Sequence, residues 1–252
     1  KFNDKYPFVY QYTARQFLDQ ALNTRSDSLS NFNRKIAGKY KAGLGLRYLA
    51  DYIGDTIISS SFKEFYQKNK LNFAKSESFK KIVSKKTSKD INWFFDEYLT
   101  TDKKIDYTIK KAVVLDDSVY VTIKNKRNIT APVALYGLKN KQVKVKKWLT
   151  NIDSTTTVVI PKNGFNRVSL NFENSYPEFN SMDNWKKVGK NILNKPIQFK
   201  LYKDINDPYY HQIYLQPNIK YNYYDGALLG LRIHNKPILS RNSQFSITPQ
   251  YG

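Results

Sequence analysis

The sequence contains no cysteine, only two histidines and one methionine, and half as many acidic as basic side chains, 21 against 42. Without cysteine the chain has no disulfide, no thiolate zinc site and no cysteine nucleophile. No apolar run approaches the roughly eighteen residues of a membrane-spanning helix, although this criterion does not detect membrane β-strands. The chain starts at Lys1 without an initiator methionine or an apolar signal region. We therefore expect the N-terminus of the gene product to lie upstream.

The composition is that of a globular protein, with 40% apolar and 15% aromatic residues among 252. The net charge of +21 suggests a module that binds polyanions, and this is one alternative for the function. However, the lysines are spread from Lys1 to Lys236 and are interleaved with Asn, Ser, Tyr and Ile. We therefore interpret most of the charge as a solvated surface and expect no nucleic-acid partner. The densest lysine group is Lys139, Lys141, Lys144, Lys146 and Lys147.

Residues 1–103 are predicted to form a helical subdomain, because apolar side chains recur there at helical spacing. Helices are predicted at 41–53, where Gly54 would end the helix, and at 76–86. Asp55 would cap a helix between these two, and the inner face of that helix would comprise Ile58, Phe62 and Phe65. A last helix is predicted to start at Ser88. Its apolar face comprises Ile91, Phe94, Phe95, Tyr98 and Leu99.

From about residue 104 the apolar spacing changes to two, which is typical of strands. Six short alternating segments between residues 105 and 172 predict an antiparallel β-sandwich over residues 104–175. Residues 176–194 are predicted to be a linker with at most one helical turn.

Longer alternating segments follow in residues 195–252. Ile213, Leu215, Ile219 and Tyr221 would lie on one face of a strand, with Gln, Asn and Lys on the other. The segment 212–224 is long enough to cross a membrane at a tilt, whereas Pro217 within it is typical of a strand edge or bulge. We predict that residues 195–252 are the initial strands of an antiparallel membrane β-barrel that this chain does not complete. The fold class is thus multidomain α+β.

Two segments resemble a known family. Residues 39–42 (Lys-Tyr-Lys-Ala) and 49–55 (Leu-Ala-Asp-Tyr-Ile-Gly-Asp) resemble the Tyr-x-Lys-Gly helix of the aminopeptidase N (membrane alanyl aminopeptidase) family of gluzincins. Residues 76–79 (Ser-Glu-Ser-Phe) and 88–99, with Asp-Ile-Asn-Trp-Phe-Phe-Asp, resemble the later helices of that family. The resemblance covers residues 36–99, and the order and separation of the two segments also fit.

This resemblance implies that residues 1–103 are the back half of a zinc metallopeptidase catalytic domain and that the β-sandwich follows it. With membrane-type strands at the end, the arrangement resembles outer-membrane proteins of the Bacteroidota. The location implied is the bacterial outer membrane, with the soluble domains periplasmic or surface-exposed. The partners implied are a peptide substrate of the parent protein, outer-membrane lipid and further proteins of a membrane assembly.

Gluzincin chemistry requires two histidines one helical turn apart in H-E-x-x-H, a later Glu ligand, and the motif Glu as general base. The only histidines, His211 and His234, lie in predicted strands without this spacing. We therefore expect no metal site and no cofactor in this chain. The resemblance places the zinc ligands before Lys1, so zinc is expected in the parent protein if its motif is intact.

One catalytic candidate remains, Tyr40. In the family a tyrosine two residues before the motif lysine donates a hydrogen bond to the oxyanion of the tetrahedral intermediate. Here Lys39 holds that position and Tyr40 stands one residue later, and one residue rotates a helical side chain by about 100°. Two readings of the parent protein therefore stay open: a membrane-associated zinc metallopeptidase, and a catalytically inactive gluzincin-like scaffold in an outer-membrane assembly.

Overall fold

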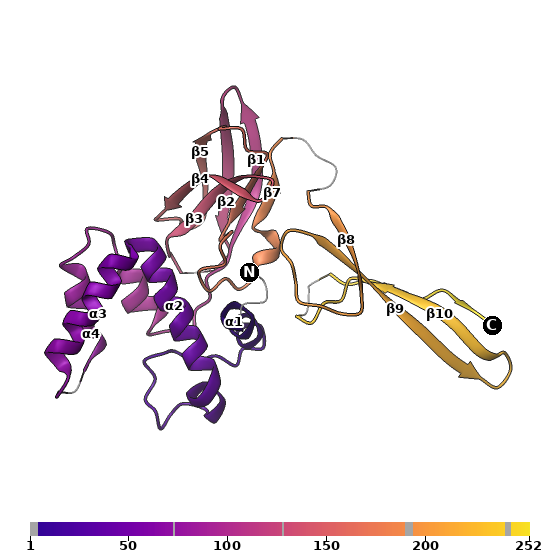
Figure 1. The fold of residues 1–252 in the computed structure, drawn as a ribbon, viewed down its shortest axis with the longest axis horizontal. Coiled ribbons are helices and arrows are strands. Elements are labelled where there is room, and N and C mark those ends of the chain that lie inside the picture. The colour runs from indigo at the N-terminus through magenta and orange to yellow at the C-terminus, as the bar shows by residue number, and fades with distance from the viewer. Residues whose placement is uncertain (1–4, 73, 128, 190–193, 240–242) are drawn as a thin grey trace.

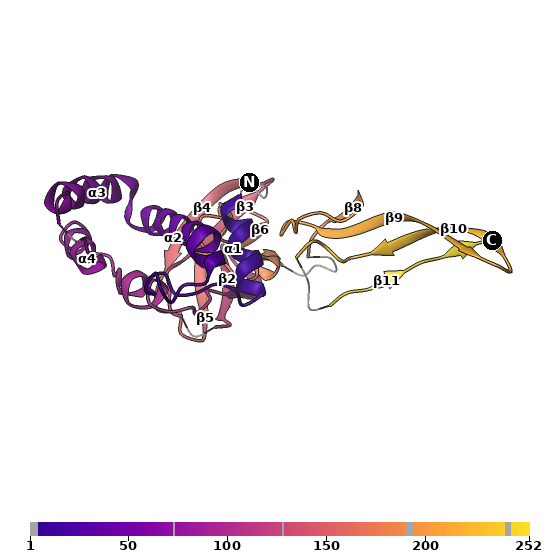
Figure 2. The same cartoon turned by 90° about the horizontal axis from the view of Figure 1, so that it is seen from below.

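A computed structural model of the chain describes residues 5–72, 74–127, 129–189, 194–239 and 243–252. The molecule is elongated and has three parts in chain order, as Figures 1 and 2 show. Helices form one end, a two-sheet β body lies in the middle, and a narrow sheet projects from the other end. The mixed α+β class predicted from the sequence is confirmed.

The helical part contains four α-helices and two short π-helical turns within the described residues. The elements are α1 (Lys5–Arg15), η1 (Asn33–Ala37), α2 (Gly38–Ile53), α3 (Asp55–Asn69), α4 (Ser76–Ser84) and η2 (Trp93–Tyr98). The predicted helices at 41–53 and 76–86 are confirmed, whereas α1 and η1 were not predicted. Gly54 ends α2 with a φ of 113°, a conformation that favours glycine.

Two predicted caps are wrong. Asp55 is the first residue of α3, whose cap position is occupied by Gly54 without a side-chain hydrogen bond. Ser88 does not start the last helix, because helical residues begin at position 92 and Asn92 occupies the cap position of η2. The carboxylate of Asp90 instead accepts a hydrogen bond of 2.9 Å from the Asn92 backbone N–H. The predicted apolar face is correct, since Phe94, Phe95 and Tyr98 are buried.

The β body is a sandwich of two antiparallel sheets. One has the order β1-β2-β5 and the other β4-β3-β6-β7. The strands are β1 (Tyr107–Leu115), β2 (Ser118–Asn125), β3 (Val133–Lys139), β4 (Gln142–Leu149), β5 (Thr155–Pro161), β6 (Arg167–Leu170) and β7 (Trp185–Lys187). Strand β7 and the buried Tyr176 come from the range predicted to be a linker, so residues 176–189 pack into the sandwich. Residues 190–193 lie outside the described residues.

The helices and the sandwich share one hydrophobic core. Tyr48 of α2 is fully buried, and its ring lies 4.4 Å from Trp93 and 4.7 Å from Tyr176, measured between ring centroids. Its hydroxyl donates a hydrogen bond to the backbone carbonyl of Pro132. Because buried aromatic contacts connect η2, α2 and the sandwich, these two parts form a continuous packed body.

The projecting sheet contains β8 (Ile197–Leu201), β9 (His211–Asn222), β10 (Gly226–His234), β11 (Ser246–Ile247) and β12 (Gln250–Tyr251). Strands β9 and β10 form a hairpin, and Gly226 has a φ of 72° at its turn. The expectation of an antiparallel arrangement is wrong for β8, which pairs with β9 in parallel. Pro217 lies beyond Leu215, the last β9 residue paired with β8, so its missing N–H leaves that pairing intact.

Candidate functional site

Three consecutive residues of α2 lie in three different environments. Lys39 is exposed and lines a groove between α2 and the α3–α4 hairpin. Tyr40 is half-buried and packs edge-on against Tyr6 of α1, with 5.0 Å between the ring centroids. Lys41 is buried beneath both. Lys39 thus lies at the groove, whereas Tyr40 faces α1.

The ring of Tyr40 contacts Tyr6 and Lys39. The Lys39 ammonium is 5.4 Å from the centre of the Tyr40 ring, and no hydrogen bond joins the Tyr40 hydroxyl to another described residue. A tyrosine that stabilises an oxyanion needs its hydroxyl directed at the reacting atom. The role assigned to Tyr40 from the resemblance therefore stays a prediction.

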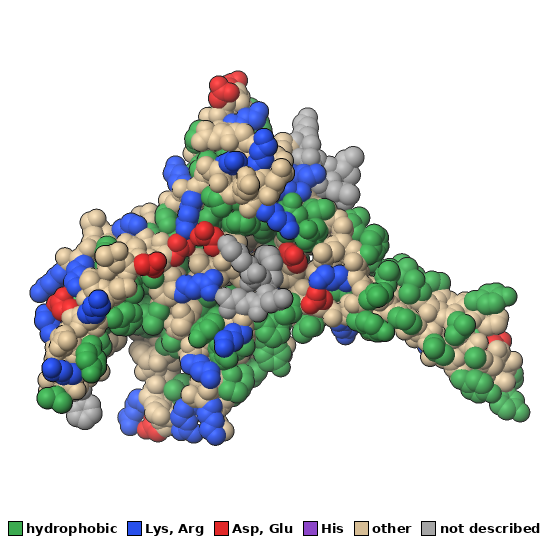
Figure 3. Space-filling view, in the orientation of Figure 1, with side chains coloured by type: hydrophobic (Ala, Val, Ile, Leu, Met, Phe, Trp, Pro, Cys, Tyr) green, Lys and Arg blue, Asp and Glu red, His purple; other side chains and the backbone are tan. Residues whose placement is uncertain are grey.

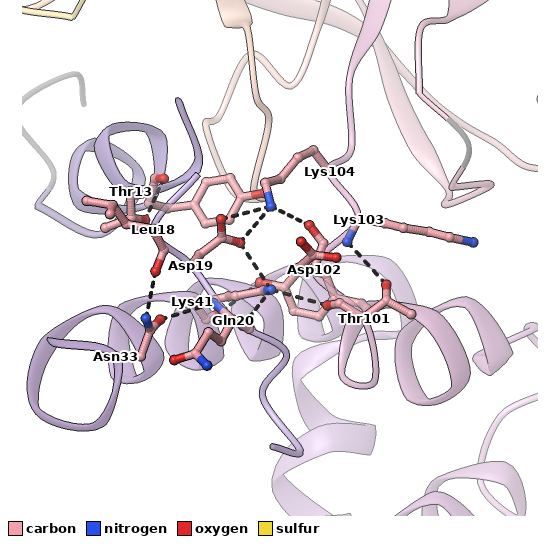
Figure 4. Close-up of polar contacts among 12 residues, drawn as sticks. Thr13, Leu18, Asp19, Gln20, Asn33, Lys41, Thr101, Asp102, Lys103 and Lys104 are labelled. Carbon is pink, nitrogen blue, oxygen red and sulfur yellow. Dashed lines mark hydrogen bonds and ion pairs between the residues drawn. The ribbon is translucent and has the colours of Figure 1, made fainter. Parts of the chain in front are cut away.

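Lys41 belongs to a buried ion cluster centred on Asp19 (Figure 4). The Lys41 ammonium lies 3.3 Å from one Asp19 carboxylate oxygen, and the Lys104 ammonium lies 2.8 Å from the other. Lys41 also donates hydrogen bonds to the backbone carbonyls of Gln20, at 3.1 Å, and Thr101, at 3.4 Å. The side chains of Lys41, Asp19 and Lys104 are 3%, 1% and 6% exposed, so all three charges are removed from water.

The cluster connects three distant segments of the chain. Asp19 follows α1, Lys41 lies on α2, and Lys104 shortly precedes β1, the first strand of the sandwich. Burial lowers the pKa of Lys41 and neighbouring Lys104 lowers it further, while Asp19 opposes both effects. Removing one partner of such a buried group leaves an uncompensated charge, which is strongly destabilising. We therefore assign Lys41 a structural role at this junction.

The residues described do not fit a zinc ion. His234 is buried in β10, where its Nε2 is 3.2 Å from the side-chain oxygen of Gln216 and its Nδ1 accepts a hydrogen bond from the Lys236 backbone N–H. His211 is exposed at the start of β9. Throughout the described part of the chain, no group of three or more His, Asp or Glu side chains could hold a metal ion.

Lysines of the densest group differ in their surroundings: Lys139, Lys144 and Lys147 are exposed, whereas Lys141 and Lys146 contact other side chains. Lys146 bonds to Asp51 of α2 at 2.7 Å and to Glu173 at 2.8 Å. Lys141 lies over the ring of Tyr209, 4.4 Å from its centre. Two of these lysines thus make contacts within the protein.

The projecting sheet carries a continuous apolar face. Residues that pair across neighbouring strands point to the same side of a sheet and thus form a row across it. In this sheet, several such rows consist of apolar residues alone. Leu201, Leu215, Ile233 and Ile247 form one row across four strands, and Ile219, Leu229 and Tyr251 form a second. We define the apolar face as Phe199, Leu201, Ile213, Leu215, Ile219, Tyr221, Leu229, Leu231, Ile233, Ile247 and Tyr251.

This apolar face is the exposed one. Ile219, Leu229 and Tyr251 are 73%, 63% and 85% exposed. The opposite face is polar and more buried: Gln212, Tyr214 and His234 are at most 1% exposed. There Gln212 donates a hydrogen bond of 3.3 Å to Gln198 and accepts one of 3.1 Å from the Tyr214 hydroxyl. Sheets of soluble proteins place their apolar side inward, so this sheet has the reverse arrangement.

Figure 3 shows the same division over the surface. Hydrophobic side chains lie along the projecting sheet, whereas Lys and Arg gather over the helices and the sandwich. All charged residues of the hairpin strands, Lys220 and Arg232, belong to the polar face. At the tip, Tyr223 and Tyr224 are 90% and 94% exposed.

Comparison with known proteins identifies no family for this chain. No protein-family model matches the sequence, and no curated protein matches it. Among solved structures, aminopeptidase A of Legionella pneumophila, crystallised in complex with aspartic acid, is similar to 56% of the chain. The sequence identity is 18% and the TM-score is 0.47, and the chain spans 18% of the length of that protein.

Proposed function

We propose that this chain holds a peptidase-like body at a lipid bilayer, with the projecting sheet as the membrane anchor. The observation that supports this proposal is the reversed arrangement of the sheet, with its apolar face exposed and its polar face more buried. In water each fully exposed Leu, Ile or Phe forgoes about 1.5–3 kcal/mol that burial would provide. Acyl chains would cover all of these side chains at once.

The dimensions and the tip of the hairpin also support a lipid partner. Strand β9 contains 12 residues and β10 contains 9, and a tilted strand of about 9–11 residues crosses the hydrocarbon layer. Exposed tyrosines at the tip are typical of the membrane–water interface, where the ring is in hydrocarbon and the hydroxyl is in water. Among the described residues, no helix is long and apolar enough to cross a bilayer.

The body of the protein is proposed to be peptidase-like because of the resemblance of residues 36–99. Its two segments fold as α2 and as α4 with η2, in the order that the resemblance implies. The proposal also includes an outer-membrane location, closure of the sheet into a barrel with strands from elsewhere, and zinc in the parent protein. We expect the isolated chain to retain no zinc stoichiometrically and to hydrolyse no aminoacyl substrate, since its described residues include no ligand set that activates water. Retained zinc together with aminopeptidase activity would overturn that expectation.

Vesicle flotation tests the anchor. The full chain is diluted from urea into vesicles of zwitterionic phosphatidylcholine at high salt, which screens attraction between the net charge of +21 and any anionic lipid. We expect binding that is independent of salt. Leu229→Lys should weaken it by about 2–4 kcal/mol, or at least about thirtyfold in partition coefficient, if this position lies near the bilayer midplane.

Leu228→Lys is the matched control. Leu228 neighbours Leu229 in β10 but lies on the polar face, opposite Lys220. The same charge introduced there should leave flotation largely unchanged. Equal effects of the two substitutions, or binding only to anionic vesicles at low salt, would overturn the anchor and favour the polyanion-binding alternative.

A further inference from the structure

A second apolar surface lies in the helical part, far along the chain from the projecting sheet. A pocket of about 520 Å³ opens between η1 and α2 on one side and α3, α4 and η2 on the other. Phenylalanines from three elements form its wall. We define this aromatic groove by Phe62, Phe65, Phe79, Phe94 and Phe95, together with Leu22, Leu46 and Leu99. The volume is within the range of about 300–1,000 Å³ that is usual for small-molecule sites.

The phenylalanine rings of the groove wall pack against one another, and one of them is partly exposed to solvent. The Phe79 ring lies 4.7 Å from Phe62, 5.4 Å from Phe65 and 6.0 Å from Phe95, measured between centroids. Phe62 is nevertheless 39% exposed, although the sequence predicts it on the inner face of its helix. The structure thus holds an aromatic side chain at the mouth of the groove instead of in the core.

Both π-helical turns of the described chain border this groove. The turn η1 supplies Arg34 and leads into Lys39, and η2 supplies Phe94 and Phe95. In an α-helix, residues five apart point about 140° away from each other. The wider π-turn reduces this angle, and Arg34 and Lys39 both line the groove. Single π-turns occur frequently at functional sites.

The charge at the groove has one sign. Arg34, Lys39 and Lys75 line it, and no Asp or Glu does so among the described residues. Arg34 and Lys39 are exposed and have no ion pair with a carboxylate of the described chain. An apolar wall with unpaired cations at its mouth is complementary to a ligand with an apolar chain and one anionic head.

We propose that the aromatic groove binds an amphiphile with a single carboxylate head and an acyl chain. The acyl chain packs against Phe62, Phe65 and Phe79, and the carboxylate meets Arg34 and Lys39. This proposal does not depend on the membrane anchor, because the groove and the projecting sheet share no residue.

Calorimetric titration of the full chain with dodecanoate, below its micellar concentration, tests the proposal. We expect saturable binding with one ligand per chain, and at least fivefold weaker binding to the double variant Arg34→Gln, Lys39→Gln. Lys35→Gln is the matched control, because Lys35 is exposed on the same turn but does not line the groove. All three side chains are exposed, so the circular dichroism spectra of both variants should match the spectrum of the unsubstituted chain.

Dodecyltrimethylammonium, with the same chain and the opposite charge, should bind at least fivefold more weakly than dodecanoate. Equal binding of the two amphiphiles, or an unchanged affinity of the double variant, would overturn the proposal and assign dodecanoate binding to exposed apolar surface in general. A concentration-dependent dimer that excludes dodecanoate would also overturn it, because a second copy of the chain would then cover the groove.

Discussion

Asp106 provides the most quantitative test of the structure. Its side chain is 3% exposed at the start of the sandwich, and it forms ion pairs with the Lys126 ammonium at 3.5 Å and with Arg127 Nε at 3.7 Å. Burial raises the pKa of Asp106 to about 6 from its ordinary value of 3.8, although Lys126 and Arg127 lower it. The folded chain therefore binds a proton between pH 3.8 and 6 that the unfolded chain releases.

The sign of the effect follows from this difference. Because the pKa is raised in the folded state, the free energy of unfolding decreases as pH rises through this window and stays lowered above about pH 6. At about 1.36 kcal/mol per pH unit, the difference between 6 and 3.8 corresponds to about 3 kcal/mol. Asp106→Asn removes the ionisation, so we expect this variant to be up to about 3 kcal/mol more stable than the unsubstituted chain at pH 7.5. At pH 3.5 the free energies of unfolding of the two chains should be nearly equal.

Urea unfolding of both chains at a series of pH values measures the difference, and carbon-13 NMR of the Asp106 carboxyl gives its pKa directly. Lys126→Met should raise that pKa further, because it removes the closest positive charge. Burial and, after it, Asp106 also raise the pKa of Glu178, so a pH dependence from Glu178 should remain in Asp106→Asn. A carboxyl pKa at or below 4, or a variant less stable than the parent at pH 7.5, would refute the reasoning.

Four substitutions test the packing of the body. Asp19→Asn leaves two buried ammonium groups without their carboxylate and should lower the free energy of unfolding by about 3–5 kcal/mol in urea titrations; a change below about 1 kcal/mol would contradict the cluster. Phe94→Ala should cost about 3–5 kcal/mol in the same assay, since Phe94 is 2% exposed, and a negligible loss would argue against its place in the core. Gly45→Ala should lower the melting temperature, because its new Cβ would lie 2.2 Å from the buried ring of Tyr98. Gly43→Ala, which meets only the partly exposed ring of Tyr6, should be neutral or stabilising through helix propensity, and the reverse order of the two would contradict the packing.

Most of the strands could be predicted because the alternation of apolar and polar residues along a strand indicates which of its faces is buried. Val119, Val121 and Ile123 alternate with polar residues in β2, and all three are fully buried. Strand β7 has only three residues, Trp185 to Lys187, so no alternation marks it. Helix α2 has a stop signal in Gly54, whereas α1 buries polar Gln11 and Thr13 on its inner side and therefore shows no clear apolar stripe.

The candidate site was less accessible from sequence. A single π-turn interrupts the helical spacing for only one turn, so the apolar pattern could not distinguish η1 and η2 from α-helix. Asp19 is separated from Lys41 by 22 residues and from Lys104 by 85, and nothing local marks it as their partner. The apolar alternation of β9 and β10 was visible, but only the structure distinguishes an exposed apolar face from a buried one.

The central claim is that the apolar face contacts lipid, and site-specific labelling tests it most directly. The chain has no cysteine, so single cysteines at 219 and 229 on the apolar face, and at 218 and 228 on the polar face, can carry an environment-sensitive fluorophore without background. On vesicle-bound chain, we predict quenching of positions 219 and 229 by a quencher attached to the acyl chains, and of 218 and 228 only by a water-soluble quencher. Equal access of the water-soluble quencher to all four positions would contradict the account.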